Sequence, residues 1–147
     1  MQHDTDWRSV AGNGACVPMP KTTREISDHF VGLYVGAPNF DTLQKAVKYP
    51  LTLDMMFGVL RAAVEGVESR CKGADARMAY LKSLDELTRA YHYYQAGEIR
   101  LGQLRVQLAH QLFRWGALPR SRQMADRYIE ILQQALEPHA APRFARD

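Results

Sequence analysis

The pattern of apolar positions is clearest over residues 51–73, where it predicts a helix with two distinct faces. On one face apolar residues recur at spacings of three and four, which is the period of an amphipathic helix. On the other face small residues recur every fourth position, although glycine inside a helix costs about 1 kcal/mol relative to alanine. The second face therefore predicts close approach by another helix. The apolar face comprises Leu53, Phe57, Leu60, Val64, Val67 and Cys71, and the small-residue face comprises Gly58, Ala62 and Gly66, flanked by Met55 and Val59.

Residues 98–115 also predict a helix that is apolar on two faces. Ile99, Val106 and Phe113, spaced by seven, share one side with Gly102 and Ala109. Small and bulky apolar residues together let helices interlock. A central helix in a five-helix domain is also apolar on two sides, but with two helices so patterned we interpret at least one face as an intermolecular surface. The opposite side, assigned to the core, carries Leu101, Leu104, Leu108, Leu112 and Trp115.

Local signals place the remaining helices. Thr22 and Glu25 form a capping box that opens a helix ended by Gly36 and Pro38. A short helical turn over residues 40–48 follows, buried through Leu43 and Val47. Thr52 is expected to cap the helix that runs on to residue 73. The first helix buries Ile26, Phe30, Leu33 and Tyr34.

Two more helices complete the prediction. Asp75 is expected to cap a helix whose stripe ends near Tyr94, and Gly97 is expected to separate it from the helix over residues 98–115. Gly116 and Pro119 then end that helix, Ser121 caps a last one, and Pro138 stops it. The core-facing residues of the last helix are expected to be Met124, Tyr128, Ile131, Leu132 and Ala135.

These elements predict an all-α, single-domain helical bundle of about five helices over residues 22–137, assembled as a dimer. Residues 1–21 are interpreted as a mobile leader and residues 138–147 as a loose tail. The 147 residues are 46% hydrophobic and carry a net charge of +3, which is typical of a globular domain. Without a long apolar run, a secretory signal or an evident disulfide pair, the sequence predicts a cytoplasmic protein.

The search for chemistry gives few candidates. The sequence lacks the common metalloprotease, nucleotide-binding and nucleophile motifs, and its histidines never occur as a helical pair. Glu25 and His29 lie one turn apart, but two ligands do not make a metal site. Cys71 continues an apolar stripe and is expected to be a buried thiol. Tyr91 and Tyr94 are expected to point inward and Tyr93 outward. We therefore expect no enzymatic activity, no cofactor and no metal.

The C-terminal half is locally basic. Six arginines outnumber two acidic residues over residues 98–127, and arginine suits phosphate contacts. A nucleic-acid-associated helical protein is therefore the alternative reading. The arginines are scattered around the helices, however, and no helix-turn-helix pattern places a recognition helix. They are Arg100, Arg105, Arg114, Arg120, Arg122 and Arg127.

The surplus of apolar faces favours a non-enzymatic regulator that binds a partner protein, such as a transcription regulator, and that forms a homodimer. Small helical antiactivators, adaptors and secretion chaperones have this general size and composition, which is an analogy of class only. The expected interface consists of the two faces described above: Met55, Gly58, Val59, Ala62 and Gly66 on one helix, and Ile99, Gly102, Val106, Ala109 and Phe113 on the other.

Overall fold

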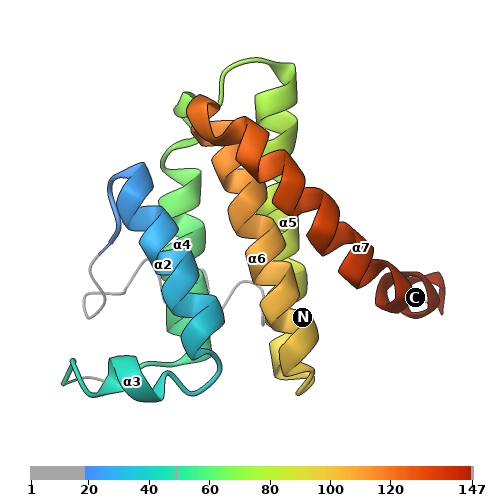
Figure 1. Cartoon of the computed structure of the whole chain (residues 1–147). Coiled ribbons are helices and arrows are strands. Elements are labelled where there is room, and N and C mark those ends of the chain that lie inside the picture. The colour runs from blue at the N-terminus through green and yellow to red at the C-terminus, as the bar shows by residue number, and fades with distance from the viewer. Residues whose placement is uncertain (1–18, 49, 147) are drawn as a thin grey trace.

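The computed structural model describes residues 19–48 and 50–146, with side chains through residue 139. Within these residues the chain forms six α-helices and no strand, so the all-α prediction is confirmed (Figure 1). No helix in this part of the chain is long and apolar enough to cross a membrane. The helices are α2 (Thr23–Gly36), α3 (Asp41–Gln44), α4 (Leu53–Glu65), α5 (Ala74–Gln95), α6 (Ile99–Ala117) and α7 (Arg122–Arg146), with 3₁₀ turns η1 (Glu68–Arg70) and η2 (Pro119–Ser121).

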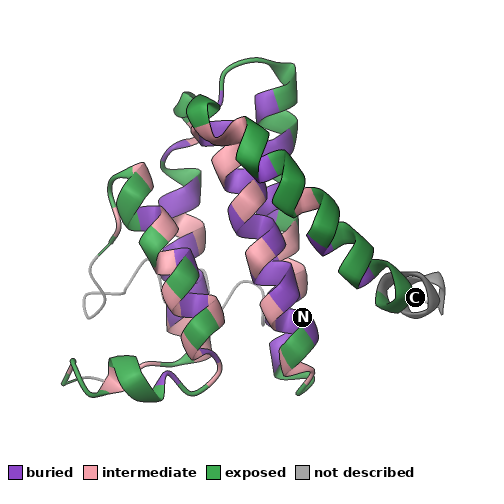
Figure 2. Ribbon diagram, in the orientation of Figure 1, coloured by how far each residue is buried: buried purple, intermediate pink, exposed green. Residues whose placement is uncertain are grey.

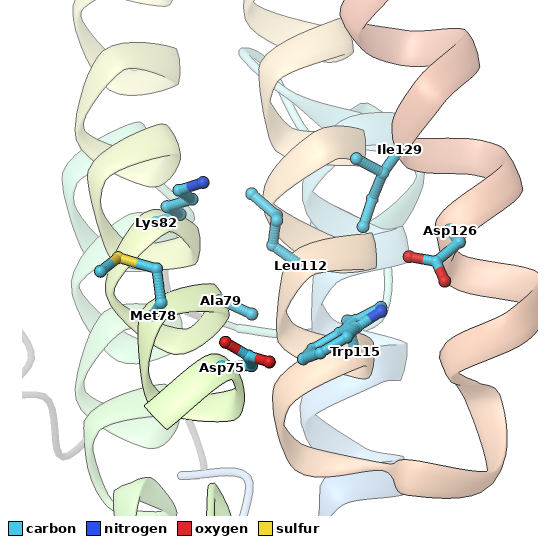
Figure 3. Close-up of a pocket in the computed structure, with 8 residues that line it drawn as sticks. All are labelled: Asp75, Met78, Ala79, Lys82, Leu112, Trp115, Asp126 and Ile129. Carbon is cyan, nitrogen blue, oxygen red and sulfur yellow. The ribbon is translucent and has the colours of Figure 1, made fainter. Parts of the chain in front are cut away.

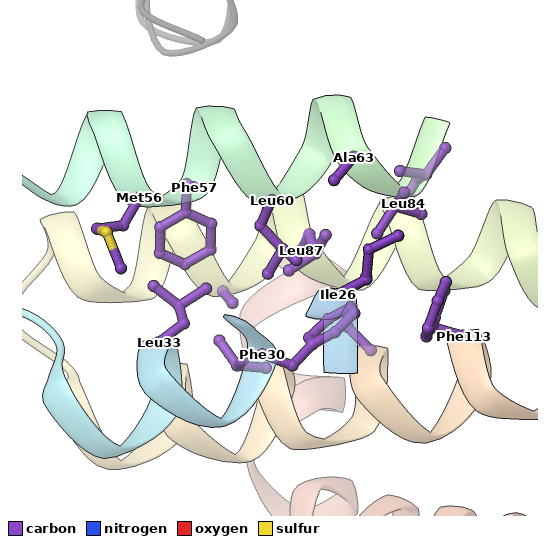
Figure 4. Packing of buried hydrophobic residues seen from close by; sticks show 14 of the residues in the cluster. Ile26, Phe30, Leu33, Met56, Phe57, Leu60, Ala63, Leu84, Leu87 and Phe113 are labelled. Atoms are coloured by element: carbon purple, nitrogen blue, oxygen red, sulfur yellow. The ribbon is translucent and has the colours of Figure 1, made fainter. Parts of the chain in front are cut away.

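Helices α2, α4, α5 and α6 pack around one core, whereas α7 packs mainly on α6. Figure 1 shows α5 and α6 side by side, α2 beside α4, and α7 crossing α6 and running away from the other helices. The core is filled from all four central helices, with Phe30 and Leu33 of α2 facing Phe57 and Leu60 of α4 (Figure 4). Each fully buried side chain of this size contributes roughly 1.5–3 kcal/mol through removal from water.

A second, smaller cluster joins α7 to α6. It contains Leu104, Leu108 and Leu112 of α6 and Leu132 and Leu136 of α7. The leucine side of α6 therefore faces a core, as predicted, but this core is shared with α7 rather than with α2 or α4. Helix α6 thus lies between two apolar clusters.

Several start signals are confirmed. Glu25 N–H donates to Thr22 Oγ1, and the Glu25 carboxylate accepts from Thr22 N–H, which completes the capping box. Thr52 caps α4 by accepting from Met55 N–H. Gly97 adopts a positive φ of 81° between α5 and α6, a conformation that favours glycine. The break that the sequence predicted is therefore present.

The predicted helix over residues 51–73 ends early. Helix α4 stops at Glu65, Gly66 is its C-cap, and the chain continues through η1. Val67 and Cys71 are still buried, because the turn carries the apolar residues back onto the core. Helix α5 begins at Ala74 with Gly73, rather than Asp75, as its N-cap.

Two predicted helix ends lie further along the chain than expected. Gly116 is inside α6, and α7 continues past Pro138 to Arg146, so residues 138–146 are helical rather than a loose tail. A proline within a helix bends it rather than always ending it, and Figure 1 shows the axis of α7 turning near its C-terminal end. Leu43, expected to be buried, is exposed. Of the predicted leader, residues 1–18 lie outside the described residues.

Helices α5 and α6 approach closely at Gly116. A Cβ atom at this position would lie 2.9 Å from the carbonyl oxygen of Ala76, so the α5 and α6 backbones touch there. At Gly66, where the sequence predicted such an approach, a Cβ would meet only Ala62 and Ala63 of its own helix, at 3.5 and 3.4 Å. Close packing without a side chain therefore joins α5 and α6 at Gly116, whereas no other helix lies against Gly66 of α4.

A buried ion pair also fixes α6 against α5. Arg105 is 4% exposed, and its guanidinium donates to both carboxylate oxygens of Glu86 at 2.8 and 3.0 Å. Burial raises the pKa of Glu86, and the nearby Arg105 opposes that shift. The Ser83 hydroxyl donates to the Ala109 carbonyl oxygen at 2.9 Å. These polar contacts fix how the two helices face each other.

Candidate functional site

The predicted interface on α6 lies inside the protomer. Val106 and Ala109 are fully buried, Phe113 is 1% exposed, and Gly102 lies against the ring of Tyr94. Phe30 of α2 covers this face, with its ring 5.6 Å from that of Phe113. Ile99 is partly buried against the same core. This is a correction to the expectation, because the side chains assigned to a second chain are already covered by the chain itself.

The predicted interface on α4 is also largely covered. Gly58 and Val59 are buried, and Met55 and Ala62 are partly buried. Gly66 is exposed, with no other helix close to it. These five positions do not form a continuous exposed apolar surface. A surface for another protein must therefore be sought elsewhere.

The exposed apolar residues of α7 form a candidate surface. Met124, Tyr128 and Ile131 are 54%, 46% and 58% exposed, and they recur at spacings of four and three, so they share one side of the helix. We call these three residues, together with the exposed Ala135, the α7 stripe. All of these residues were expected to face the core together with Leu132, and of this set Leu132 does so. The side of α7 that faces α6 is offset by one residue and comprises Ala125, Ile129, Leu132 and Leu136.

One wall of a groove on α6 is formed by Met124, Tyr128 and Ile131 of the α7 stripe, together with Leu132. Tyr34 of α2 lines the opposite wall, and Gln107, His110, Gln111 and Arg114 of α6 form the floor. We call this depression the α2–α7 groove. It has a volume of about 490 Å³. In Figure 2, α6 carries buried and partly buried residues between α2 and α7, while much of α7 is exposed. The groove therefore combines apolar walls with a polar floor.

His110 lies deep in the groove. Its ring stacks on Phe30 at 4.8 Å between centroids, and the residue is 7% exposed. Burial, assisted by the positive charge of Arg114, lowers the pKa of His110 to about 4. Its Nε2 atom is buried and has no hydrogen-bond partner among the described residues. An unpaired buried polar atom is costly, so a group that enters the groove and pairs with it would be stabilised.

Arg114 is the charged residue of the groove floor. It is partly buried, and its guanidinium donates to Gln111 Oε1 at 3.2 Å and lies 4.0 Å from Met124 Sδ. It makes no ion pair with a described carboxylate. Other arginines of the described chain do, such as Arg105 with Glu86 and Arg77 with Glu68. Arg114 is therefore a cation held in a partly apolar groove without a compensating anion.

A second depression lies on the other side of α7, between α5, α6 and α7. Figure 3 shows the side chains of Asp75, Trp115 and Asp126 gathered along it. Lys82 also lines it, so two carboxylates face one ammonium group. Trp115 is covered by the guanidinium of Arg122, which lies 4.5 Å from the ring centroid. This depression therefore differs in charge from the α2–α7 groove and is the more acidic of the pair.

The arginines of the C-terminal half do not form one surface. Arg105 is buried against Glu86, and Arg122 lies over Trp115 while donating to its carbonyl oxygen at 2.7 Å. Arg114 lies in the groove, and the other three are exposed. Arg105 and Arg122 are therefore engaged within the chain, and the nucleic-acid alternative stays a prediction. The exposed ones are Arg100, Arg120 and Arg127.

The remaining candidates for chemistry are in the core. Cys71 is buried, as expected, and burial raises the pKa of its thiol. Tyr93, expected to point outward, is instead buried beside the leucines of the α6–α7 cluster. Within residues 19–48 and 50–139, no three His, Cys, Asp or Glu side chains come together as a metal site would require. Comparisons with family models, curated proteins and solved structures find no match to this chain.

Proposed function

We propose that this protein is a non-enzymatic interaction module that binds an amphipathic helix of a partner protein in the α2–α7 groove. The observation that carries the proposal is the α7 stripe, whose three large apolar side chains are each about half exposed along one wall of the groove. Helix-in-groove recognition uses such a surface, with the incoming helix inserting side chains at spacings of three and four. The partner helix would lie on α6 between α2 and α7.

A module of this kind acts by covering a helix that its partner otherwise uses. That mode of action is shared by antiactivators, adaptors and secretion chaperones, and a transcription regulator is one class of partner that exposes such helices. The homodimer expected from the α4 and α6 faces stays a prediction, and those faces are largely covered within one protomer. A second copy competing for the groove would have to use the same α7 stripe.

The test is selection of peptides against the full chain. A displayed library of amphipathic helical peptides, each about four turns long and roughly sixteen residues, is panned on the wild-type protein. Selected peptides are then measured by fluorescence anisotropy. We expect Ile131→Glu to weaken binding at least about tenfold, because it places a charge in the apolar wall.

The matched control is Leu81→Glu. Leu81 is 50% exposed, similar to Ile131, but it lies on α5 and does not line the groove. It should leave peptide affinity unchanged. Peptides that bind the wild type and Ile131→Glu equally well would show that the groove is not the binding site. Failure to select any peptide would count against the proposed function as a whole.

A further inference from the structure

We infer that the helix bound in the α2–α7 groove carries a carboxylate, which forms an ion pair with Arg114 at the end of the groove next to Met124. This inference rests on the proposed function and adds the chemistry of the partner to it. A second copy of this chain and a partner without a specific charge are the alternatives that the test must separate.

The first argument is the state of Arg114. A guanidinium that is partly removed from water loses hydration and needs an anion or several hydrogen bonds in return. In the described structure Arg114 has one hydrogen bond, to Gln111, and a distant contact with a sulfur atom. A carboxylate offers the planar, two-oxygen acceptor that a guanidinium pairs with best. Among the described residues, the groove therefore offers Arg114 no anion.

The second argument is the charge of the groove lining. Among the residues described as lining it, Arg114 is charged and none is an aspartate or glutamate. Across α7, Asp75 and Asp126 line the neighbouring depression (Figure 3). Lys82 offsets one of these two carboxylates, so that depression keeps a small excess of negative charge, whereas the α2–α7 groove carries the positive charge of Arg114. An acidic helix is therefore favoured in the α2–α7 groove. This difference gives the α2–α7 groove a charge preference that apolar contact alone would not supply.

Geometry fixes where the carboxylate lies. The large side chains of the α7 stripe span from Met124 to Ile131, about two helical turns or roughly 10 Å. Arg114 contacts Met124, at the end of the stripe nearest η2. The acidic residue of the partner should therefore lie at one end of its apolar stripe rather than in the middle. The apolar side chains of the partner helix would then contact Tyr128 and Ile131.

His110 supplies an independent reporter of the ion pair. It lies in the same groove floor, four residues before Arg114, and the charge of Arg114 contributes to lowering its pKa. Burial is the larger cause of the lowered pKa, and any bound helix adds to it, whereas a carboxylate beside Arg114 offsets the positive charge. The pKa of His110 should therefore be higher with the Glu peptide bound than with the Gln peptide bound. The other titratable or charged side chains lining the groove are Tyr34 and Tyr128, besides Arg114. This change is measured by nuclear magnetic resonance of the imidazole, independently of affinity.

The decisive experiment varies charge on both sides of the contact. Helical peptides with an apolar stripe, and with Glu, Gln or Lys at the position ending that stripe, are titrated into the wild type, Arg114→Gln and Arg114→Glu by fluorescence anisotropy. With the wild type, we expect the Glu peptide to bind about tenfold tighter than the Gln peptide. With Arg114→Gln that difference should fall to about twofold or less, and with Arg114→Glu the Lys peptide should become the best ligand.

Arg127→Glu is the matched control, since Arg127 is exposed on α7 and does not line the groove. It should keep the preference for Glu, and circular dichroism should show every variant folded. Equal binding of the three peptides to the wild type, with binding still lost in Ile131→Glu, would overturn the carboxylate inference and leave the proposed function standing. A wild-type dimer in sedimentation that dissociates in Ile131→Glu would instead assign the groove to a second copy and overturn the inference.

Discussion

Helices α6 and α7 each carry two apolar faces, yet only one of them keeps a face open. On α6, the leucine face packs on α7 and the Val106–Phe113 face packs on α2, so both are covered within the chain. On α7, the face containing Leu132 and Leu136 packs on α6, while the α7 stripe remains exposed. The same sequence pattern therefore marks a core in one helix and a candidate docking wall in the other.

The difference follows from position in the fold. Helix α6 has helices on both sides, because α2 packs on one face and α7 on another. Helix α7 is the last element and has contacts mainly with α6, and its far end runs away from the body (Figure 1). An apolar face in the interior finds a partner within the chain. An apolar face on an outer helix has no such neighbour among the described helices and is a candidate surface for another molecule.

The strongest test of this contrast is the same substitution on each face. Phe113→Glu places a carboxylate at a position that is 1% exposed and packed on Phe30, so we expect a loss of more than about 4 kcal/mol and an unfolded or aggregated chain. Ile131→Glu changes an exposed position and should alter the free energy of unfolding by less than about 0.5 kcal/mol. Urea denaturation followed by circular dichroism measures both. A folded, stable Phe113→Glu would restore the interface that the sequence predicted.

Helix starts could be predicted from the sequence because their causes are local. Thr22 and Glu25 satisfy each other's backbone groups within one turn, and Gly97 needs only its own positive φ. What covers a face is not local. Phe30 and Phe113 are distant in the chain, and periodicity shows that a face is apolar without showing what packs on it. That is why the α6 face was assigned to a partner.

The prediction that Met124, Tyr128 and Ile131 face the core was wrong because two adjacent sides of α7 have the same spacing of apolar residues. The residues Met124, Tyr128, Ile131 and Ala135 follow the same four-three-four spacing as Ala125, Ile129, Leu132 and Leu136, one residue along. Together they form one broad apolar arc, and periodicity does not decide which edge faces α6. The groove floor was also missed, because Gln107, His110 and Arg114 read as an ordinary polar side of a helix. What distinguishes these residues is that they lie between apolar side chains of α2 and α7. That arrangement is known only from the fold.

His110 lies in the groove floor, between the α6 face that Phe30 covers and the exposed α7 stripe. The pH dependence of the free energy of unfolding should show how well it is buried. Its pKa is about 4 in the folded protein and about 6.5 when unfolded. The unfolded state therefore binds the proton first, and stability present above pH 6.5 is lost as pH falls towards 4. The loss should approach roughly 3 kcal/mol at about 1.4 kcal/mol per pH unit. Denaturation across this range should show the slope in the wild type.

The comparison for this prediction is His110→Gln, which cannot take up the proton. Its stability should vary less between pH 6.5 and 4 than that of the wild type. Some slope should remain, because burial also lowers the pKa of His29. Identical slopes in the two proteins would mean that His110 is as accessible to protons in the folded state as in the unfolded chain. The groove floor would then be open to water rather than closed by Phe30.

The smallest expected effects concern two glycines, one where helices touch and one where the surface is open. In Gly116→Ala the new Cβ would lie 2.9 Å from the Ala76 carbonyl oxygen, so a backbone must shift, and we expect a loss of about 1–3 kcal/mol. Gly66 has an ordinary helical φ of −67° and no other helix against it. Gly66→Ala should therefore stabilise the protein by about 0.4–1 kcal/mol, because alanine restricts the unfolded chain. Thermal denaturation should show a lower melting temperature for Gly116→Ala and a higher one for Gly66→Ala than for the wild type. A destabilised Gly66→Ala would mean that another chain approaches α4 as the sequence predicted, and a neutral Gly116→Ala would mean that α5 and α6 separate without cost.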